Sequence, residues 1–313
     1  MRLGDDGNGN GCLILTARRE NYSGKNFTSG RVNSKNRIAF KHGKIEASIK
    51  LPRTANGLWP AFWMMGNDYD EVGWPKCGET DILEMGNAEG IKHGTQERFF
   101  NGACHWGQGW PAASYAKSTT KTYSLQDGEF HLFTVIWDEN AISMYVDLDR
   151  QPRQNPYYKI DIPADDPDNE WSAGNYFHKD NFILFNLAVG GDFTGLHNAS
   201  DITALNDGNG NEASMYVNFV RIYQKGLTTE NLDALDPGDR DSSAGASDMI
   251  AEDNGHISFD GNTVTSAHPS LALYSLSGLK VAATDCGVLS VDSLSPGVYL
   301  AHSPLHTEKI CIR

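Results

Sequence analysis

The segment that decides the expected fold and chemistry is Cys77-Gly78-Glu79-Thr80-Asp81-Ile82-Leu83-Glu84-Met85-Gly86. Three of its carboxylates, Glu79, Asp81 and Glu84, lie within six residues of strand-like sequence. Side chains alternate along a regular strand, so Glu79 and Asp81 share one face and Glu84 falls on the other. A β-bulge that sets Ile82 and Leu83 against one partner residue would bring all three to one face. Because bulges are over-represented beside active sites, the segment predicts a catalytic strand.

This set of carboxylates suits the hydrolysis of a glycosidic bond. The reaction needs a carboxylate that attacks or stabilises the sugar and a carboxylic acid that protonates the leaving oxygen. An aspartate one pleat from Glu79 is close enough to share a proton with it and to couple the two titrations. A solvated acidic edge strand or a cation site is the alternative interpretation of the same residues.

Further motifs carry a resemblance to a known family. They are Ser29-Gly30-Arg31, Gly43-Lys44-Ile45-Glu46-Ala47, Gly57-Leu58-Trp59-Pro60-Ala61-Phe62-Trp63-Met64-Met65-Gly66, Gly102-Ala103-Cys104-His105-Trp106-Gly107, Phe185-Asn186-Leu187-Ala188-Val189-Gly190-Gly191 and Val217-Asn218-Phe219-Val220-Arg221-Ile222-Tyr223. With them the chain resembles glycoside hydrolase family 16 from about Asn8 to Lys225. The resemblance is to the laminarinase-like branch, which carries the bulged Glu-x-Asp-x-x-Glu motif and a following His-Trp pair.

The resemblance implies a role for each carboxylate. Glu79 would be the nucleophile, Glu84 the general acid/base, and Asp81 the partner that hydrogen-bonds the nucleophile. The implied activity is a retaining endo-glycosidase that hydrolyses β-1,3-glucan of the laminarin type, with mixed-linkage β-1,3/1,4-glucan as a further candidate substrate. Hydrolases of red-algal galactans share the bulged motif and are the alternative within the family. A non-catalytic glycan-binding lectin is the alternative of another class, and three intact carboxylates argue against it.

Six residues are predicted to bind the glycan: Trp59, Trp63, His105, Trp106, Arg31 and Asn186. Indole rings stack on the apolar C–H faces of sugars, and their N–H can serve a hydroxyl. Strand alternation puts Trp59 and Trp63 on the same face, and the family resemblance places that face in the cleft. A guanidinium can donate to several hydroxyls. The structural alternatives are core tryptophans, a histidine or asparagine in a buried network, and a surface arginine.

The apolar pattern indicates an all-β protein. Ile45, Ala47 and Ile49 alternate with polar residues, which predicts a strand with one wet face, and segment 130–137 is apolar on both faces, which predicts burial between two layers. No segment shows a convincing helical period. Short strands separated by Gly-, Asn- and Asp-rich turns predict a jelly-roll β-sandwich with a concave glycan-binding cleft.

Composition shifts divide the chain into three parts. Residues 1–226 form the expected catalytic jelly roll, with an N-terminal strand of the family missing; 227–254 form an acidic flexible linker; and 255–313 form a small β domain with a hairpin at Asp260-Gly261. Two segments of the last part, Leu273-Tyr274-Ser275-Leu276-Ser277-Gly278-Leu279-Lys280-Val281 and Leu294-Ser295-Pro296-Gly297-Val298-Tyr299-Leu300, resemble the C-terminal sorting domain of the bacterial type IX secretion system. That resemblance implies the secretion machinery as a partner.

Charge and hydropathy restrict the partners and the location. The formal net charge is −14 and the sequence pI about 5.1, which excludes an extended surface for nucleic acid or an anionic membrane. No apolar run approaches the roughly 20 residues that span a bilayer. The start, Met1-Arg2-Leu3-Gly4-Asp5-Asp6, shows no signal peptide. We expect a secreted or cell-surface bacterial protein whose signal is absent from this chain.

No cofactor and no metal site is predicted. Asp207-Gly208-Asn209-Gly210-Asn211-Glu212 begins like a calcium loop but lacks the glycine and glutamate that an EF-hand needs at positions six and twelve. The family resemblance implies a structural calcium ion held by an aspartate near the last strand, but Asn218 stands there. Cys12, Cys77, Cys104, Cys286 and Cys311 lack zinc-like spacing. Buried thiols are favoured, with Cys77–Cys104 and Cys286–Cys311 bridges as alternatives.

Overall fold

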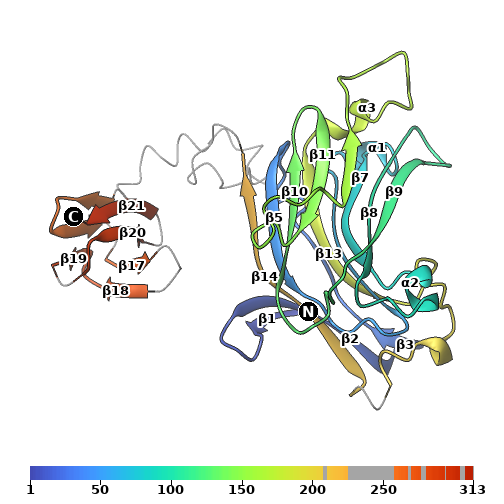
Figure 1. Cartoon of the computed structure of the whole chain (residues 1–313), viewed down its shortest axis with the longest axis horizontal. Helices are drawn as coiled ribbons and strands as arrows, with labels where there is room; N and C mark the ends of the chain where they lie inside the picture. Colours follow the sequence, from blue (N-terminus) through green and yellow to red (C-terminus); the bar gives the residue numbers. More distant parts are fainter. Residues whose placement is uncertain are drawn as a thin grey trace. The chain divides into compact units, whose positions relative to one another are not determined.

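The computed structural model describes residues 1–206, 210–224, 257–266, 269–275, 280–292, 294–303 and 307–312. The chain divides into two compact units; the first contains strands β1 to β14 and the second strands β15 to β21 (Figure 1). The expected linker, 227–254, lies outside the described residues, so its boundaries stay predictions.

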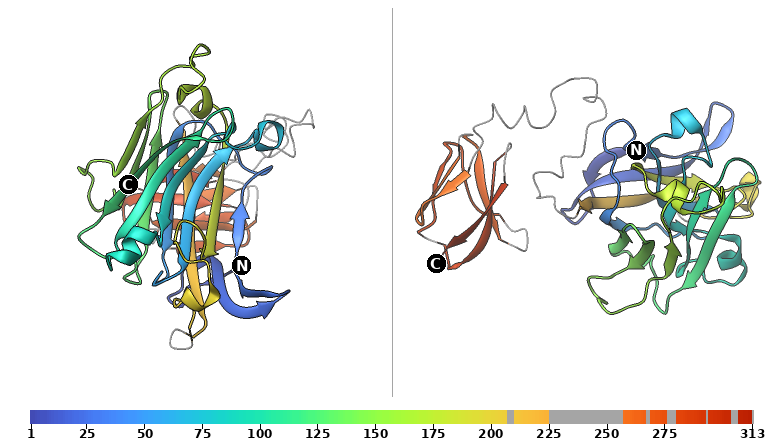
Figure 2. Two further views of the ribbon diagram at one scale, coloured as in Figure 1. Left: turned by 90° about the vertical axis from the view of Figure 1, so that its right-hand side faces the viewer. Right: turned by 90° about the horizontal axis from the view of Figure 1, so that it is seen from above.

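The larger unit is a sandwich of two antiparallel sheets (Figures 1 and 2). The eight-stranded sheet has the order β1-β2-β14-β5-β10-β11-β12, with β3 paired to β2: β1 (Arg2–Asp5), β2 (Gly11–Tyr22), β3 (Lys25–Thr28), β5 (Gly43–Lys50), β10 (His131–Trp137), β11 (Ala141–Val146), β12 (Tyr158–Asp161) and β14 (Glu212–Tyr223). The six-stranded sheet has the order β4-β13-β6-β7-β8-β9: β4 (Arg31–Asn33), β6 (Leu58–Gly66), β7 (Glu79–Met85), β8 (Phe99–Trp106), β9 (Ala113–Thr120) and β13 (Asn181–Val189).

Helices are few and short in the described residues: α1 (Tyr69–Val72), α2 (Ala88–Lys92), α3 (Gly174–Phe177) and one 3₁₀ turn, Ala199–Asp201. The all-β jelly-roll prediction is therefore confirmed. None of these helices is long and apolar enough to cross a membrane.

Strand alternation separates the core from the concave face. On β6, Phe62 and Met64 are buried in the core between the sheets, while Ala61, Trp63 and Met65 form a separate cluster on the opposite face. This confirms the predicted parity of the segment and leaves one face of the six-stranded sheet available for a site.

Two strand predictions need correction. Segment 130–137 is not buried on both faces: β10 belongs to the eight-stranded sheet, whose second face is an outer surface, and Ile136 is 38% exposed there. Conversely, the polar face of β5 is not wet, because Glu46 and Ser48 are buried. The ammonium of Lys44 lies 2.5 Å from the Glu46 carboxylate and pairs with it.

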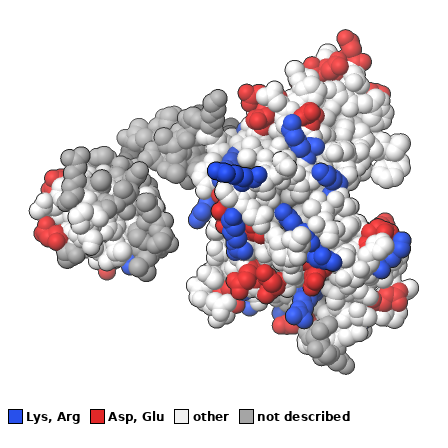
Figure 3. Space-filling view, in the orientation of Figure 1, with Lys and Arg blue, Asp and Glu red and all other residues white. Residues whose placement is uncertain are grey.

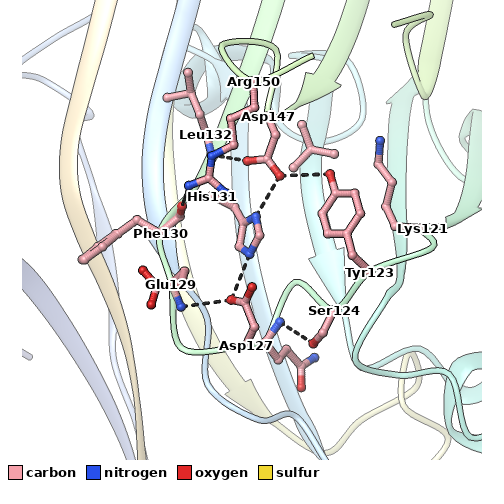
Figure 4. A network of polar contacts seen from close by, with 12 residues as sticks. Lys121, Tyr123, Ser124, Asp127, Glu129, Phe130, His131, Leu132, Asp147 and Arg150 are labelled. Carbon is pink, nitrogen blue, oxygen red and sulfur yellow. Dashed lines mark hydrogen bonds and ion pairs between the residues drawn. The ribbon is translucent and has the colours of Figure 1, made fainter.

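A buried polar network fixes one end of the sandwich (Figure 4). His131, at the start of β10, contacts Asp147 through Nδ1 at 2.8 Å and Asp127 through Nε2 at 3.2 Å. Tyr123 donates its hydroxyl hydrogen to Asp147 at 2.9 Å, and the same carboxylate accepts the backbone N–H of Leu132. The network therefore joins the loop before β10 to the turn after β11.

The smaller unit consists of two sheets with their own core. Their orders are β15-β16-β19 and β18-β17-β20-β21: β15 (Ile257–Phe259), β16 (Thr263–Ser266), β17 (Leu271–Ser275), β18 (Lys280–Thr284), β19 (Val288–Ser290), β20 (Gly297–His302) and β21 (Thr307–Ile312). The predicted hairpin is present: β15 pairs with β16, and Asp260 Oδ1 accepts the N–H groups of Asn262 and Thr263.

Acidic and basic side chains are interspersed on the larger unit's surface drawn in Figure 3. Lys44 and Lys50, both on β5, pair with Glu46 and Asp6. These two basic side chains are therefore partly neutralised by neighbouring carboxylates.

Candidate active site

The predicted bulge is present on β7. Asp81 pairs with Ala103 of β8 and Glu84 pairs with Asn101, so Ile82 and Leu83 together oppose Gly102. Both apolar side chains are fully buried in the core. Because the bulge absorbs one residue, Glu79, Asp81 and Glu84 all turn to the opposite, concave face.

The residue opposite the bulge, Gly102, has little room for a side chain. A Cβ on Gly102 would lie 3.1 Å from Met144 Sδ and 3.1 Å from a ring carbon of Tyr157. Tyr157 also donates its hydroxyl hydrogen to the carbonyl of Ile82. The bulge is thus held from the core side by a tyrosine that packs against the glycine.

A cavity of about 500 Å³ lies on the concave face. It is lined by all three carboxylates and by four of the predicted glycan-binding residues, Arg31, Trp59, Trp63 and Asn186; Ser29, Gly30, Ala61, Leu187 and Ala188 complete the lining. These residues come from β4, β6, β7 and β13 and from the chain just before β4.

Burial sets the protonation of two of the carboxyl groups. Desolvation raises the pKa of Asp81 well above its ordinary value, and the Glu79 carboxylate beside it raises it further, through charge and through a hydrogen bond. Desolvation also raises the pKa of Glu84, and the charge of Asp81 adds to this effect. The surroundings of Asp81 and Glu84 therefore favour the protonated form of both carboxyl groups.

Tryptophan N–H groups are directed at the two glutamates. Trp59 Nε1 donates to Glu84 Oε1 at 3.0 Å, and its ring stacks on Phe193 with centroids 4.8 Å apart. Trp74 Nε1 donates to Glu79 Oε2 at 2.5 Å. Each glutamate thus has one oriented indole as a hydrogen-bond donor.

Three further residues of the cavity, Trp63, Asn186 and Arg31, form a second cluster. Trp63 Nε1 donates to Asn186 Oδ1 at 2.8 Å, and the Arg31 guanidinium lies 4.5 Å from the centre of the Trp63 ring. The strand register places Arg31 beside Asn186 on β13. The cluster offers an indole face and guanidinium N–H groups, which suit a sugar.

His105 and Trp106 lie on opposite faces of β8. His105 is opposite Glu79 in the register, and its Nε2 lies 3.3 Å from Asp81 Oδ2. Trp106 instead belongs to the core, where its indole donates to the carbonyl of Trp171 at 2.9 Å. Consecutive strand residues face opposite sides, so the prediction that Trp106 binds the glycan is corrected to a core role.

Comparisons with known proteins agree with this geometry. The family model described as glycosyl hydrolases family 16 matches residues 5–166. The chain belongs to this family. It is 31% identical to the glucan endo-1,3-beta-glucosidase A1 of Niallia circulans over 213 residues, which cover 64% of this chain and 26% of that protein. The chain spans 26–28% of the length of the first curated relatives it matches.

Solved family 16 structures are also similar. A Bacteroides ovatus family 16 enzyme of a mixed-linkage glucan locus, in complex with a G4G4G3G product, is 42% identical with a TM-score of 0.61, covering 70% of this chain and 84% of that chain. The catalytic domain of an endo-1,3-beta-glucanase (laminarinase) from Thermotoga petrophila is 29% identical with a TM-score of 0.52, covering 70% and 79%.

Three residues near the family 16 carboxylates were not predicted from the sequence. Trp74 precedes Glu79 by five positions, and this proximity was the available signal. Phe193 reaches Trp59 from the loop after β13, which only the tertiary structure reveals. Asn101 is opposite Glu84 on β8 and is buried.

One group of described residues has metal-like spacing. Glu79, Asp81 and His105 each place a donor atom within 4.8 Å of the others. Burial and the neighbouring Glu79 charge raise the pKa of Asp81, which favours the protonated form of this carboxyl group. Proton sharing with Glu79 accounts for the group without an ion.

The groups around Asn218, where the family resemblance implies a calcium ion, make hydrogen bonds within the chain. The Asn218 side chain donates through Nδ2 to the carbonyl of Gly11 at 3.2 Å. The neighbouring Asp6 carboxylate accepts from the Lys50 ammonium at 2.8 Å, and this hydrogen bond holds the pKa of Asp6 below its ordinary value. Lysine therefore already neutralises the carboxylate that a cation would need.

For four of the five cysteines the structure distinguishes a free thiol from a disulfide bridge. Cys77 and Cys104 are free, buried thiols, so the bridge considered between them is absent; Cys12 and Cys286 are free as well. Burial raises the pKa of Cys77 to about 11 and that of Cys104 to about 12. The side chain of Cys311 lies outside the described residues.

Proposed function

We propose that this protein is a retaining endo-β-glucanase that cleaves glucans containing β-1,3 linkages. The observation that carries the proposal is the bulged strand β7, which presents Glu79, Asp81 and Glu84 to one cavity while raising the pKa of Asp81 and Glu84. A protonated acid beside a carboxylate is the arrangement that glycosidic hydrolysis requires.

The mechanism assigns one step to each group. Glu79 attacks the anomeric carbon as the bond to the leaving oxygen breaks, and Glu84 gives its proton to that oxygen. Asp81 keeps its proton and hydrogen-bonds Glu79, which limits repulsion between the two. In the second step water loses a proton to Glu84 and its oxygen attacks the anomeric carbon, which releases Glu79. No metal ion takes part, so we expect a chelator to leave activity unchanged.

Mixed-linkage β-1,3/1,4-glucan is the preferred substrate in this proposal. The mixed-linkage enzyme of Bacteroides ovatus is 42% identical to this chain, against 29% for the Thermotoga laminarinase. Laminarin is the second candidate. A galactan hydrolase remains the alternative within the family, because a keratan-sulfate endo-1,4-beta-galactosidase of Sphingobacterium multivorum is 28% identical.

The test compares four polysaccharides. Barley β-glucan, laminarin, agarose and xyloglucan are incubated with the protein and new reducing ends are measured, with Glu79→Ala as the inactive control. We expect the largest rate on barley β-glucan and none on xyloglucan. Cleavage of agarose alone would replace the glucanase proposal, and binding without cleavage would support a lectin.

Retention of configuration is tested separately. Proton NMR of the first products should show the β-anomer before mutarotation, because two successive displacements restore the configuration. Glu79→Ala should also join an α-glycosyl fluoride to an acceptor, with Glu84 as the base. An initial α-anomer would contradict the assignment of Glu79 as nucleophile.

We also infer that the protein is secreted or displayed at the cell surface, with residues 255–313 as its sorting signal. The support is the sequence resemblance to type IX sorting domains and a core confined to the smaller unit. Residues 227–313 fused to a reporter should be exported by a bacterium that has this system and retained by a strain that lacks it. Retention of the reporter in both strains would contradict the inference.

A further inference from the structure

The most exposed tryptophan of the described residues lies close to the catalytic strand. Trp110, in the loop that joins β8 to β9, is 84% exposed. Its ring centre is 6.0 Å from that of Trp74, with the planes inclined at 36°. Trp74 in turn donates to Glu79. The two rings therefore form an aromatic pair that starts at a catalytic carboxylate and extends into solvent.

Trp110 lies on the opposite side of β7 from the cavity. The sheet order is β4-β13-β6-β7-β8-β9, and the strand residues that line the cavity come from β4, β13, β6 and β7. The loop after β8 is beyond this set, at the same end of the unit as α1 (Figure 1). A glucan that crosses the sheet through the cavity would continue over β8 toward this loop.

The loop that carries Trp110 is anchored on the segment 170–176. Gln108 Nε2 donates to the Tyr176 hydroxyl oxygen at 2.9 Å, and Tyr176 donates to the carbonyl of Glu170 at 2.6 Å. Before the loop, the indole of Trp106 is fixed by the carbonyl of Trp171. These hydrogen bonds support the loop on which Trp110 lies. Its indole ring stays exposed, although burial of so large an apolar ring would be favourable.

The position of the cavity indicates which units of a glucan chain could reach Trp110. The reacting ring has to lie in the cavity, because Glu79 must contact its anomeric carbon and Glu79 lines that cavity. The glucosyl units that continue from this ring across β7 then reach the loop that carries Trp110. An exposed indole pair offers these units the flat apolar surface that sugar C–H faces stack on.

We propose that Trp110 is a substrate-binding residue of an outer subsite on the leaving-group side, where it stacks on a glucosyl unit and favours long glucan chains. This inference rests on the proposed glucanase function. It predicts that Trp110 contributes only when the substrate has sugar on the leaving side.

The experiment compares substrates with and without leaving-side sugar. Wild type, Trp110→Ala, Trp110→Phe and the control Tyr223→Ala are assayed on barley β-glucan, on mixed-linkage oligosaccharides of increasing length and on a β-glycosyl fluoride. Tyr223 is a 40% exposed aromatic on the other sheet. Trp110→Ala should lower kcat/KM on long chains by about 10-fold, mainly through KM, as expected for loss of one aromatic stack. Trp110→Phe should keep most of the wild-type kcat/KM on long chains, because an aromatic ring remains.

The β-glycosyl fluoride separates failure of the subsite proposal from failure of the glucanase proposal. Trp110→Ala should hydrolyse it as fast as wild type, because fluoride leaves without any sugar on that side. Equal losses on fluoride and long chains, or no loss on either, would overturn the subsite. If wild type cleaves neither the fluoride nor any glucan, the glucanase proposal itself fails and the subsite fails with it.

Discussion

Asp81 and Glu84 show how burial serves chemistry at the expense of stability. Both carboxyls lose most of their solvation on β7, and desolvation is the largest cause of their raised pKa. A carboxyl with a raised pKa in the folded state favours folding while it is protonated. That contribution is lost as the pH rises above the pKa of the unfolded chain.

Asp81→Asn should therefore stabilise the protein at neutral pH. At pH 7 Asp81 is ionised in the unfolded chain and must take up a proton on folding, whereas the amide keeps an N–H donor near Glu79 without that cost, so Tm should rise. The difference should vanish near pH 3, below the ordinary pKa of 3.8, where Asp81 is protonated in both states. Activity should fall at the same time. Thermal melts across this pH range check the sign, and a lower Tm at pH 7 would contradict the raised pKa.

Glu84 should control the alkaline side of the activity profile. Its raised pKa means that wild-type kcat/KM falls as the pH rises through that pKa, because the general acid loses its proton. Glu84→Gln should lower kcat/KM on glucan by about 10²- to 10⁴-fold. The loss should be much smaller on a glycosyl fluoride, whose leaving group needs no proton. Similar losses on both substrates would assign Glu84 another role.

At the scale of elements, alternation along a strand decides which tryptophans meet the substrate. Trp59 borders the cavity and donates to Glu84, whereas Trp106 packs in the core against Phe177. Both lie on strands of the same sheet, so their different environments come from the face and not from the sheet.

Truncation of these two tryptophans should have different consequences. Trp106→Ala should lower the free energy of unfolding by about 3–5 kcal/mol, because it opens a cavity in the core. Trp59→Ala should mainly raise KM and alter the pH profile, with a smaller change in stability. Denaturant unfolding and steady-state kinetics on both variants provide the comparison. A stability loss of the same size for Trp59→Ala would assign it to the core.

The network around His131 should make stability depend on pH. Burial alone lowers the pKa of His131, but its contacts with Asp147 and Asp127 outweigh burial and raise it. The resulting stabilisation is present below the ordinary value of 6.5 and is lost as the pH rises through the raised pKa. His131→Ala should lower the free energy of unfolding by about 3–5 kcal/mol at pH 6, because it leaves Asp147 buried without its partner. Tm between pH 6 and pH 9 should fall in wild type and change less in the variant.

For the whole molecule, the site and the smaller unit are separable. Every residue that lines the cavity lies between Ser29 and Ala188, and the smaller unit has a core of its own. The carboxylates proposed to be catalytic therefore need no side chain from the C-terminal part.

A protein that ends after residue 226 should keep its activity on soluble glucan. We expect kcat/KM within about twofold of the full chain, because separate cores allow domains to fold alone. Circular dichroism confirms that the shortened protein is folded before activity is compared. A large loss in kcat with the fold intact would place part of the smaller unit in the catalytic machinery.

Features that depend on local alternation could be predicted from the amino-acid sequence. Three carboxylates brought together by one bulge, the shared face of Trp59 and Trp63, and the hairpin at Asp260 follow from side-chain period and turn chemistry. The error at Trp106 was avoidable on the same ground, since it directly follows His105 and must face the other way.

Contacts between distant segments, and the burial that results from them, could be seen only in the tertiary structure. Phe193, in the loop after β13, stacks on Trp59 of β6, and Trp110, in the loop after β8, meets Trp74, in the loop before β7, because these strands are neighbours in the sheet. The protonation of Asp81 and Glu84 likewise comes from burial under neighbouring strands, and the exposure of Ile136 from which sheet β10 joins. Strand period fixes the face of a side chain, but the partners across that face depend on how the sheets and loops pack.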